Sequence, residues 1–280
     1  MIKILCDSSL DLSKKLIEEF ELTVVPFGVT MGDKEYKDGV DLTPQMIFDH
    51  VESTGVLPKT SALNEYQWQE EFEKYKDEEA VICLTISSKA SVTYANAKKA
   101  AENYSNVYVI DSLSLSSGMG IQAIYARKLA RQGLSAGEIV KKVEDRRANV
   151  QISFATYKLN YLHKGGRCSS VQLLGANLLK IRPSIIMTNG SLGMHKKYMG
   201  PMAKVCKKYV ADTLEEFNKP NKELVFITHA SATPDIVGAV REELLSKFQP
   251  DRLEETVAGA TVTSHCGENT IGIIYYNDQI

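Results

Sequence analysis

Three features that mark special classes of protein are missing from this sequence of 280 residues. No apolar run approaches the roughly 18 residues of a membrane-spanning helix, so stable insertion into a membrane is not expected. Positive charge is not in excess, because 33 Lys and Arg face 35 Asp and Glu, and this balance argues against nucleic acid as a partner. The five cysteines form no Cys-x-x-Cys pair, so neither a disulfide framework nor a zinc site is predicted.

The start of the chain, MIKILCDSSLDLSKK, lacks the pattern of a signal peptide. Its apolar run covers about five residues and acidic residues follow directly, whereas a signal peptide has a longer apolar core. Cys6 and Cys83 lie inside apolar runs, where cysteine is usually a small buried side chain. These observations predict a protein of the reducing cytoplasm.

The first half of the sequence alternates between apolar strands and helices. Continuous apolar runs of strand length occur at Ala80–Ile86 and Val107–Asp111, and such runs are typical of parallel strands buried on both faces. Thr43-Pro44 is a typical helix start, and another helix is expected over 91–103. The alternation predicts parallel βαβ units in an N-terminal α/β domain of residues 1–155.

The second half mixes hairpin and helix signals. Asn189-Gly190 separates two strand-like runs, which is a strong hairpin signal. Helices are predicted over 201–217 and 234–248, and a loop is predicted over 161–170. The sequence therefore predicts a C-terminal α+β domain of residues 156–280, and an α/β fold of two domains for the whole chain.

The most informative polar stretch is Thr85–Ser91, where hydroxyl side chains follow a buried strand. Ser88 comes at the carboxyl end of that strand, and open α/β sheets bind ligands at such ends. Ser91 begins the next helix, whose free N–H groups and dipole favour an anion such as a carboxylate or a phosphate. The alternative is that Ser91 only caps its helix. A nucleophile elbow is disfavoured because the G-x-S-x-G spacing is absent.

Other polar stretches are candidates for contact with the same anion. Thr60 and Ser61 precede a predicted helix, Gly165-Gly166-Arg167 joins a flexible backbone to a cation, and His265 precedes the last strand. Each also has an ordinary explanation, namely a helix cap, a surface turn and a structural histidine. Gly118–Ala123 matches the dinucleotide pattern G-x-G-x-x-A only loosely, because it does not turn directly out of a strand.

Taken in order, these stretches resemble the DegV family of bacterial fatty-acid-binding proteins. Short motifs spread over nearly the whole chain carry the resemblance: Asp7-Ser8-Ser9, Val25-Pro26-Phe27, Tyr36–Leu42, Pro58–Ser61, Ile86–Tyr94, Ile110-Asp111-Ser112, Leu159–Arg167, Lys180–Pro183 and His265-Cys266-Gly267. Each motif alone is loose, but their order and spacing make the set specific.

The resemblance implies a two-domain carrier that holds one long-chain fatty acid, such as palmitate, stearate or oleate, in an apolar tunnel between its domains. It implies a set of residues around the carboxylate, with Thr60, Ser61, Ser91, Thr93 and His265 as ligands and Ser88, Gly165, Gly166 and Arg167 in support. It also implies a protein that is no enzyme, has no catalytic residue, and uses neither cofactor nor metal. Such a carrier presents its carboxylate to a separate fatty acid kinase, and the acyl phosphate then enters phospholipid synthesis.

The chain departs from the family pattern at three places. Val92 stands where a glycine usually follows the serine, Glu268 interrupts the last motif, and Met199 replaces an arginine in a basic stretch that helps to dock the kinase in relatives. Two other functions stay open. One is a hydrolase or acyl transferase that uses Ser91 and His265, and the other is a carrier of a different apolar anion.

Overall fold

The computed structural model describes residues 1–172 and 181–278, so Lys180, the first residue of the Lys180–Pro183 motif, lies outside the described residues. The apolar runs of the first half form a parallel sheet of four strands in the order β2-β1-β6-β7. The strands are β1 (Ile2–Asp7), β2 (Leu22–Val25), β6 (Ala80–Thr85) and β7 (Val107–Asp111). The predicted parallel sheet is therefore confirmed.

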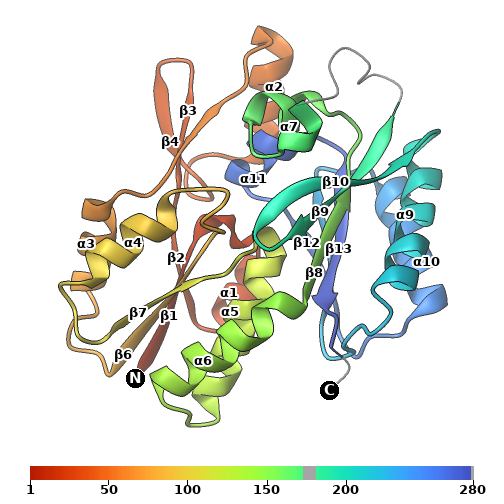
Figure 1. Ribbon diagram of the computed structural model, residues 1–280. Helices are drawn as coiled ribbons and strands as arrows, with labels where there is room; N and C mark the ends of the chain where they lie inside the picture. The colour runs from red at the N-terminus through yellow and green to blue at the C-terminus, as the bar shows by residue number, and fades with distance from the viewer. Residues whose placement is uncertain (173–180, 279–280) are drawn as a thin grey trace.

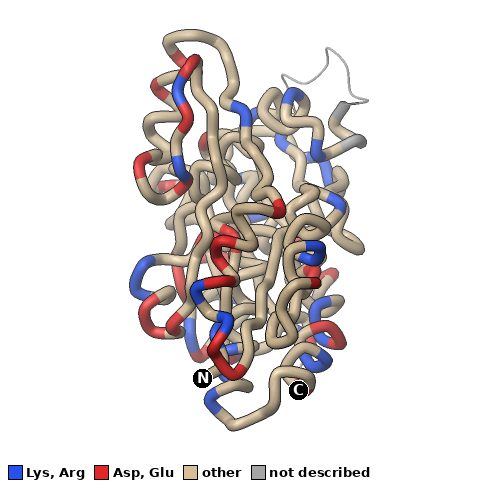
Figure 2. Tube along the Cα trace, turned by 90° about the vertical axis from the view of Figure 1, so that its left-hand side faces the viewer, with Lys and Arg blue, Asp and Glu red and all other residues tan. Residues whose placement is uncertain are grey.

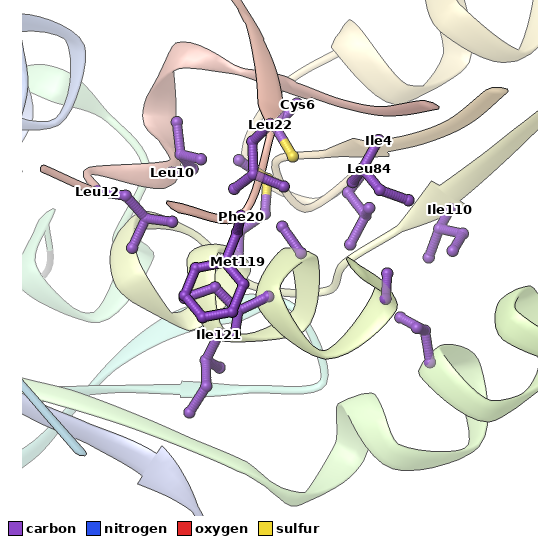
Figure 3. Packing of buried hydrophobic residues seen from close by; sticks show 14 of the residues in the cluster. Ile4, Cys6, Leu10, Leu12, Phe20, Leu22, Leu84, Ile110, Met119 and Ile121 are labelled. Atoms are coloured by element: carbon purple, nitrogen blue, oxygen red, sulfur yellow. The ribbon is translucent and has the colours of Figure 1, made fainter. Parts of the chain in front are cut away.

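The alternation of side chains along each strand decides which helices cover which face of this sheet. Ile4 and Cys6 face α1, α5 and α6, whereas Leu5 and Cys83 face α3 and α4. In Figure 3, Ile4, Cys6 and Leu84 lie over Met119 of α5. The helices are α1 (Lys14–Glu19), α3 (Glu65–Glu73), α4 (Thr93–Ala101), α5 (Ser116–Arg131) and α6 (Ala136–Arg146).

The second sheet has six strands in the order β10-β9-β8-β13-β11-β12 and is mixed, because β11 and β12 are parallel while the other neighbours are antiparallel. Its strands are β8 (Val150–Ala155), β9 (Arg182–Thr188), β10 (Ser191–Tyr198), β11 (Val225–Ala230), β12 (Leu253–Val257) and β13 (Thr270–Tyr276). The hairpin predicted at Asn189-Gly190 joins β9 to β10, with both residues at positive φ.

Helix α5 lies between the two sheets (Figure 1). Its apolar side chains belong to one core cluster with Ile152 of β8 and Ile274 of β13 as well as with the four-stranded sheet. Close packing explains the glycines of the Gly118–Ala123 stretch, because an added Cβ at Gly118 would lie 2.9 Å from Cδ1 of Ile152. The other face of the six-stranded sheet packs against α9 (Met202–Glu216) and α10 (Pro234–Lys247).

A small third sheet, in the order β4-β3-β5, stands above the first. It consists of β3 (Gly28–Met31), β4 (Lys34–Lys37) and β5 (Lys59–Ser61), and α2 (Pro44–Thr54) connects β4 to β5. Two short 3-10 helices, η1 (Ser8–Leu10) and η2 (Arg147–Asn149), follow β1 and α6.

The structure corrects the sequence analysis at several elements. The loop predicted over 161–170 contains α7 (Asn160–Gly165) and the start of α8 (Ser169–Gln172). Strands β5 and β12 were not predicted, nor was the short helix α11 (Ala260–Cys266), whose sequence ATVTSHC is rich in poor helix formers. Packing of Ala260 against the cluster of β3 and α2 overrides that weak propensity.

The position of β8 bears on the division into domains. The prediction ended the first domain at residue 155, but β8 pairs with β13 and β9 inside the six-stranded sheet. A boundary drawn between the sheets would therefore fall before Val150.

On the face shown in Figure 2, Lys and Arg are interspersed with Asp and Glu, as the balanced composition leads one to expect. Over the described residues, every helix is too short or too polar to cross a membrane.

Candidate functional site

A cavity of about 360 Å³ lies between the two halves of the chain, a volume within the ordinary range of ligand pockets. Strands β8, β11 and β13 form much of its wall, together with residues from β5, the β6–α4 loop, the start of α5, and α11. Apolar side chains dominate its lining and include Phe27, Ile86, Leu115, Ile152, Phe154, Leu162, Leu192, Val262 and Ile274. The lining therefore suits an apolar ligand or part of one.

The β6–α4 loop brings hydroxyls to one side of the cavity, and buried carboxylates hold that loop in place. Asp7 at the end of β1 accepts from the amide of Ile86 at 2.7 Å, and Asp111 at the end of β7 accepts from the amide of Ser88 at 3.1 Å. Burial raises the pKa of Asp7 to about 6, while its hydrogen bonds to Ser9 and Ile86 act in the opposite direction. The loop between two strand ends is thus a fixed frame.

Ser88 and Ser91 both line the cavity, and Thr93 is buried behind them. The predicted helix start is wrong by two residues, because α4 begins at Thr93 and Val92 occupies the N-cap without a side-chain bond. The hydroxyl oxygen of Ser91 still accepts a hydrogen bond from the amide of Thr93 at 3.3 Å, and the hydroxyl oxygens of Ser91 and Thr93 are 2.9 Å apart. Thr93 therefore contacts Ser91 and does not itself line the cavity.

The two hydroxyls on β5 point in different directions, because successive side chains of a strand alternate. Thr60 lines the cavity and is half-buried, whereas Ser61 is exposed and is not among the described lining residues. The sequence had placed Thr60 and Ser61 in a loop before a helix, since three residues of strand leave little pattern to detect. The pairing of β5 with β3 decides the difference between them.

His265 reaches the cavity from α11, a helix that the sequence analysis missed. Its Nε2 lies 2.9 Å from Oγ1 of Thr60, and this contact joins the two halves of the chain. Burial, together with the positive charge of Arg167, lowers the pKa of His265 to about 4, so the imidazole is neutral at pH 7. The group therefore acts as a hydrogen-bonding side chain and not as a cation.

The Gly165-Gly166-Arg167 stretch packs against His265 at the end of α7. An added Cβ at Gly165 would lie 2.6 Å from Nδ1 of His265, so only glycine permits this approach. Gly166 ends α7 at a φ of 69°, the left-handed region that favours glycine. Arg167 then turns back, donates to the carbonyl of Gly165 at 2.7 Å, and lines the cavity with an exposed side chain.

Several polar residues of the lining were not predicted, and most are satisfied within the protein. Ser153 bonds Gln151 and Tyr209, Thr228 bonds Ser117 and Thr256, and Thr270 bonds Thr156 and the carbonyl of Cys266. No local signal distinguishes such hydroxyls in a sequence, because their partners come from distant elements. Lys89 adds an exposed cation at the edge of the cavity.

The arrangement offers neutral hydroxyl donors, a neutral histidine and nearby cations beside an apolar wall. It does not show the hydrogen bonds of a Ser-His pair, since Ser91 bonds Thr93 while His265 bonds Thr60. In the part of the chain that the structure describes, no group of three or more His, Cys, Asp or Glu side chains is arranged to hold a metal ion.

Comparison with known proteins relates this architecture to one family. The model of the family described as "Uncharacterised protein, DegV family" matches residues 1–278. A fatty acid-binding protein of Thermotoga maritima is 30% identical over 283 residues, covering 97% of this chain and 96% of its own.

Two solved structures are similar over nearly the full length. A DegV family protein from Thermus thermophilus, described for its fatty acid binding, has a TM-score of 0.91 at 26% identity, with 98% of this chain and 99% of that chain covered. A stearic acid-binding protein from Eubacterium ventriosum has a TM-score of 0.84 at 25% identity, with 100% of both chains covered. The predicted α/β fold is confirmed by these likenesses.

Proposed function

This chain belongs to the DegV family, and from that premise we propose that it is a cytoplasmic carrier of one long-chain fatty acid. The carboxylate lies among Thr60, Ser91 and His265, and the acyl tail extends along the apolar wall. The observation that carries the proposal is the make-up of the cavity, which combines hydroxyl donors on one side with a predominantly apolar lining.

The energetics of fatty-acid binding agree with a cavity that has hydroxyl donors on one side and a predominantly apolar lining. Burying about 15 methylene groups at ~0.8 kcal/mol each supplies of order 10 kcal/mol, before the entropic cost of association is subtracted. A carboxylate taken out of water needs hydrogen-bond donors or it becomes protonated. Thr60 and Ser91 are within reach of the cavity to donate, and the guanidinium of Arg167 adds a favourable positive charge.

The remaining predicted residues act indirectly in this proposal. Thr93 orients the hydroxyl of Ser91 through their 2.9 Å contact, and Gly165 allows His265 to approach α7. Gly166 ends α7 so that Arg167 faces the cavity. Ser88 lies at the exposed rim. Ser61 belongs to the same edge strand as Thr60, and its part is to complete β5.

A finer step of the proposal concerns the fate of the bound acid. The carrier presents its carboxylate to an ATP-dependent fatty acid kinase, which forms the acyl phosphate used for phospholipid synthesis. The exposure of Ser88, Lys89 and Arg167 supports this step, because it leaves the head of the ligand close to the surface. Met199, exposed to 73%, stands where the family resemblance implies an arginine that helps to dock the kinase.

The kinase step can be tested with hydroxylamine, which traps acyl phosphates as hydroxamates. The loaded protein, a bacterial fatty acid kinase and ATP should yield fatty acyl hydroxamate, and Met199→Arg should increase the rate. If neither the wild type nor Met199→Arg yields hydroxamate with the kinase, the function is limited to binding.

The binding proposal is tested by native mass spectrometry of the purified protein, with gas chromatography of its organic extract. We expect one adduct with the mass of a long-chain fatty acid. An adduct of another mass would identify a different apolar anion. A protein that arrives empty and takes up neither palmitate nor oleate refutes the proposal. Hydrolysis of p-nitrophenyl acyl esters that is lost in Ser91→Ala would then favour the hydrolase.

A further inference from the structure

Two acidic motifs of the sequence have no direct part in the cavity and yet are buried close to it. Asp38, from the stretch Tyr36–Leu42, is 3% exposed, and Asp11, which follows the stretch Asp7-Ser8-Ser9, is 4% exposed. A buried carboxylate is costly unless donors surround it. The donors that meet these two carboxylates identify what the motifs do.

Asp38 binds the beginning of α11, more than 200 positions away in the sequence. Its Oδ1 accepts from the amide of Ala260 at 2.7 Å, and its Oδ2 accepts from the amide of Thr261 at 3.2 Å. The hydroxyl of Ser8 also donates to Oδ2 at 2.9 Å, because Ser8 is itself the acceptor for the amide of Phe27. Each of these three partners donates to the side chain of Asp38.

Asp11 holds the residue just before that helix. Its Oδ1 accepts from the amide of Gly259 at 2.8 Å, and its Oδ2 accepts from the hydroxyl of Ser116 at 2.5 Å. Gly259 is packed between the two acids, since an added Cβ would lie 3.0 Å from Oδ1 of Asp38 and 3.3 Å from Oδ1 of Asp11.

The helix that these acids hold contributes directly to the cavity. Thr261, Val262, His265 and Cys266 of α11 all belong to the lining. The helix has seven residues and no side-chain cap of its own, so its first amides depend on Asp11 and Asp38. His265 can meet Thr60 only while α11 keeps this position.

We propose that Asp38 is a positioning residue of the ligand site, which fixes α11 so that His265 meets Thr60 and thereby sets how fast the bound fatty acid leaves. This inference rests on the proposed function. It assigns to Asp38 no contact with the fatty acid, because Asp38 is absent from the described lining of the cavity.

The different partners of the two acids provide a matched pair of substitutions. In Asp38→Asn, the new NH₂ group must face the amide of either Ala260 or Thr261, so one donor of α11 loses its acceptor. In Asp11→Asn, the carbonyl oxygen can still face Gly259, and the hydroxyl of Ser116 can turn round to accept from the NH₂ group. Only the first substitution should loosen α11.

The measurement is the release of cis-parinaric acid, a fluorescent long-chain fatty acid, from the loaded full-length protein into excess oleate by stopped flow. We expect Asp38→Asn to release it about tenfold faster and Asp11→Asn to stay within about threefold of the wild type. If a substitution only reduces the fraction of folded protein, the variant takes up fewer equivalents of cis-parinaric acid, but the folded fraction releases it at the wild-type rate. Equal release rates for the wild type and Asp38→Asn overturn the inference.

A second variant decides the matter where Asp38→Asn does not fold. Gly259→Ala keeps an allowed backbone, with φ of −66°, but pushes a Cβ against Asp38. It should release the probe faster, whereas Gly238→Ala on α10, which meets nothing within 4 Å, should not. An unchanged rate in Gly259→Ala overturns the inference. A wild type that takes up no probe at all refutes the proposed function itself, which is a distinct result.

Discussion

The polar side chains at the mouth of the cavity and those deep in its wall are of the same chemical types, yet they are bonded differently. In the wall, Ser153 and Thr228 each bond two groups of the protein. At the mouth, among the described residues, Thr60 meets His265, and Ser91 meets Thr93, whose amide and hydroxyl can both donate to Ser91 and leave its own O–H free to face the cavity. A satisfied hydroxyl adds little affinity for a charged ligand, whereas one with remaining capacity can bind it. The bonding pattern therefore supports the placement of the head and the tail in the proposed complex.

The strongest test of this comparison blocks the tail end. Leu115 is buried at the start of α5 and lines the cavity, so Leu115→Trp should fill space that the proposed tail occupies. If about four to six methylene groups lose their place at ~0.8 kcal/mol each, binding of stearate weakens by about 3–5 kcal/mol. Isothermal titration with stearate measures the effect, and decanoate, which needs less of the cavity, is the control. Equal losses for both acids would contradict the assignment of the tail.

A pair of serines tests the comparison most directly. Ser91→Ala should weaken fatty-acid binding by about 1–3 kcal/mol, because it removes a donor to a charged group, and it also takes a partner from Thr93. Ser153→Ala should leave binding nearly unchanged, but Gln151 loses an acceptor and Tyr209 a partner, at a cost of about 1–2 kcal/mol in the free energy of unfolding.

Displacement titrations give the dissociation constant of each variant, and denaturant unfolding gives its free energy of unfolding. A Ser91→Ala protein with an unchanged dissociation constant would remove Ser91 from the site. A Ser153→Ala protein that binds as weakly as Ser91→Ala would show that the two ends do not differ in the way described.

The buried acids extend the comparison from hydroxyls to charge. Burial raises the pKa of Asp11 to about 8, and the negative charges of Asp38 and Asp7 act in the same direction. Between the unfolded pKa, near 3.8, and about 8, the folded protein holds a proton that the unfolded chain has released. Stability from this group is therefore lost as the pH rises through 8.

Asp11→Asn should remove that dependence. Between pH 6 and pH 9, the free energy of unfolding of the wild type should fall by about 1–3 kcal/mol more than that of Asp11→Asn. Urea unfolding at a series of pH values measures both. Parallel curves for the two proteins would show that Asp11 does not titrate in this range.

The smallest expected effect concerns His265. Its pKa is lowered to about 4 by burial and by Arg167. A fatty-acid carboxylate beside the imidazole favours the protonated form and should raise the pKa of His265 by about one unit or more. Titration of the ring signals by NMR, with and without oleate, checks this, and His50, His163 and His195, which are not among the described lining residues, are internal references. An unchanged pKa would place the carboxylate away from His265.

Local patterns in the chain were enough to predict most of the regular elements. The apolar run Ala80–Ile86 contains β6, because a short continuous apolar run bounded by turn signals is typical of a strand buried on both faces. The capping residues of α2 and the Asn189-Gly190 turn act within a few residues of themselves, so they too were recognisable. The same locality made Ser91 and Thr60 visible as hydroxyls near helix starts.

The site itself was only partly predictable. Strand β5 is too short to show alternation, so Thr60 and Ser61 looked equivalent until pairing with β3 separated them. Helix α11 consists largely of poor helix formers, and its amides are satisfied by Asp11 and Asp38 from the other end of the chain. No window of sequence contains both partners of such a contact.

The sequence by itself determined most of the strands and helices, and the residue types that a buried carboxylate would need. Only the tertiary structure decided which of those residues face one cavity, which hydroxyls retain hydrogen-bonding capacity, and how a weak helix carries His265 to Thr60. The physical reason is that the two kinds of interaction act over different distances along the chain. Propensity, capping and periodicity act over a few residues, whereas the satisfaction of a buried polar group depends on partners that folding brings from anywhere in the chain.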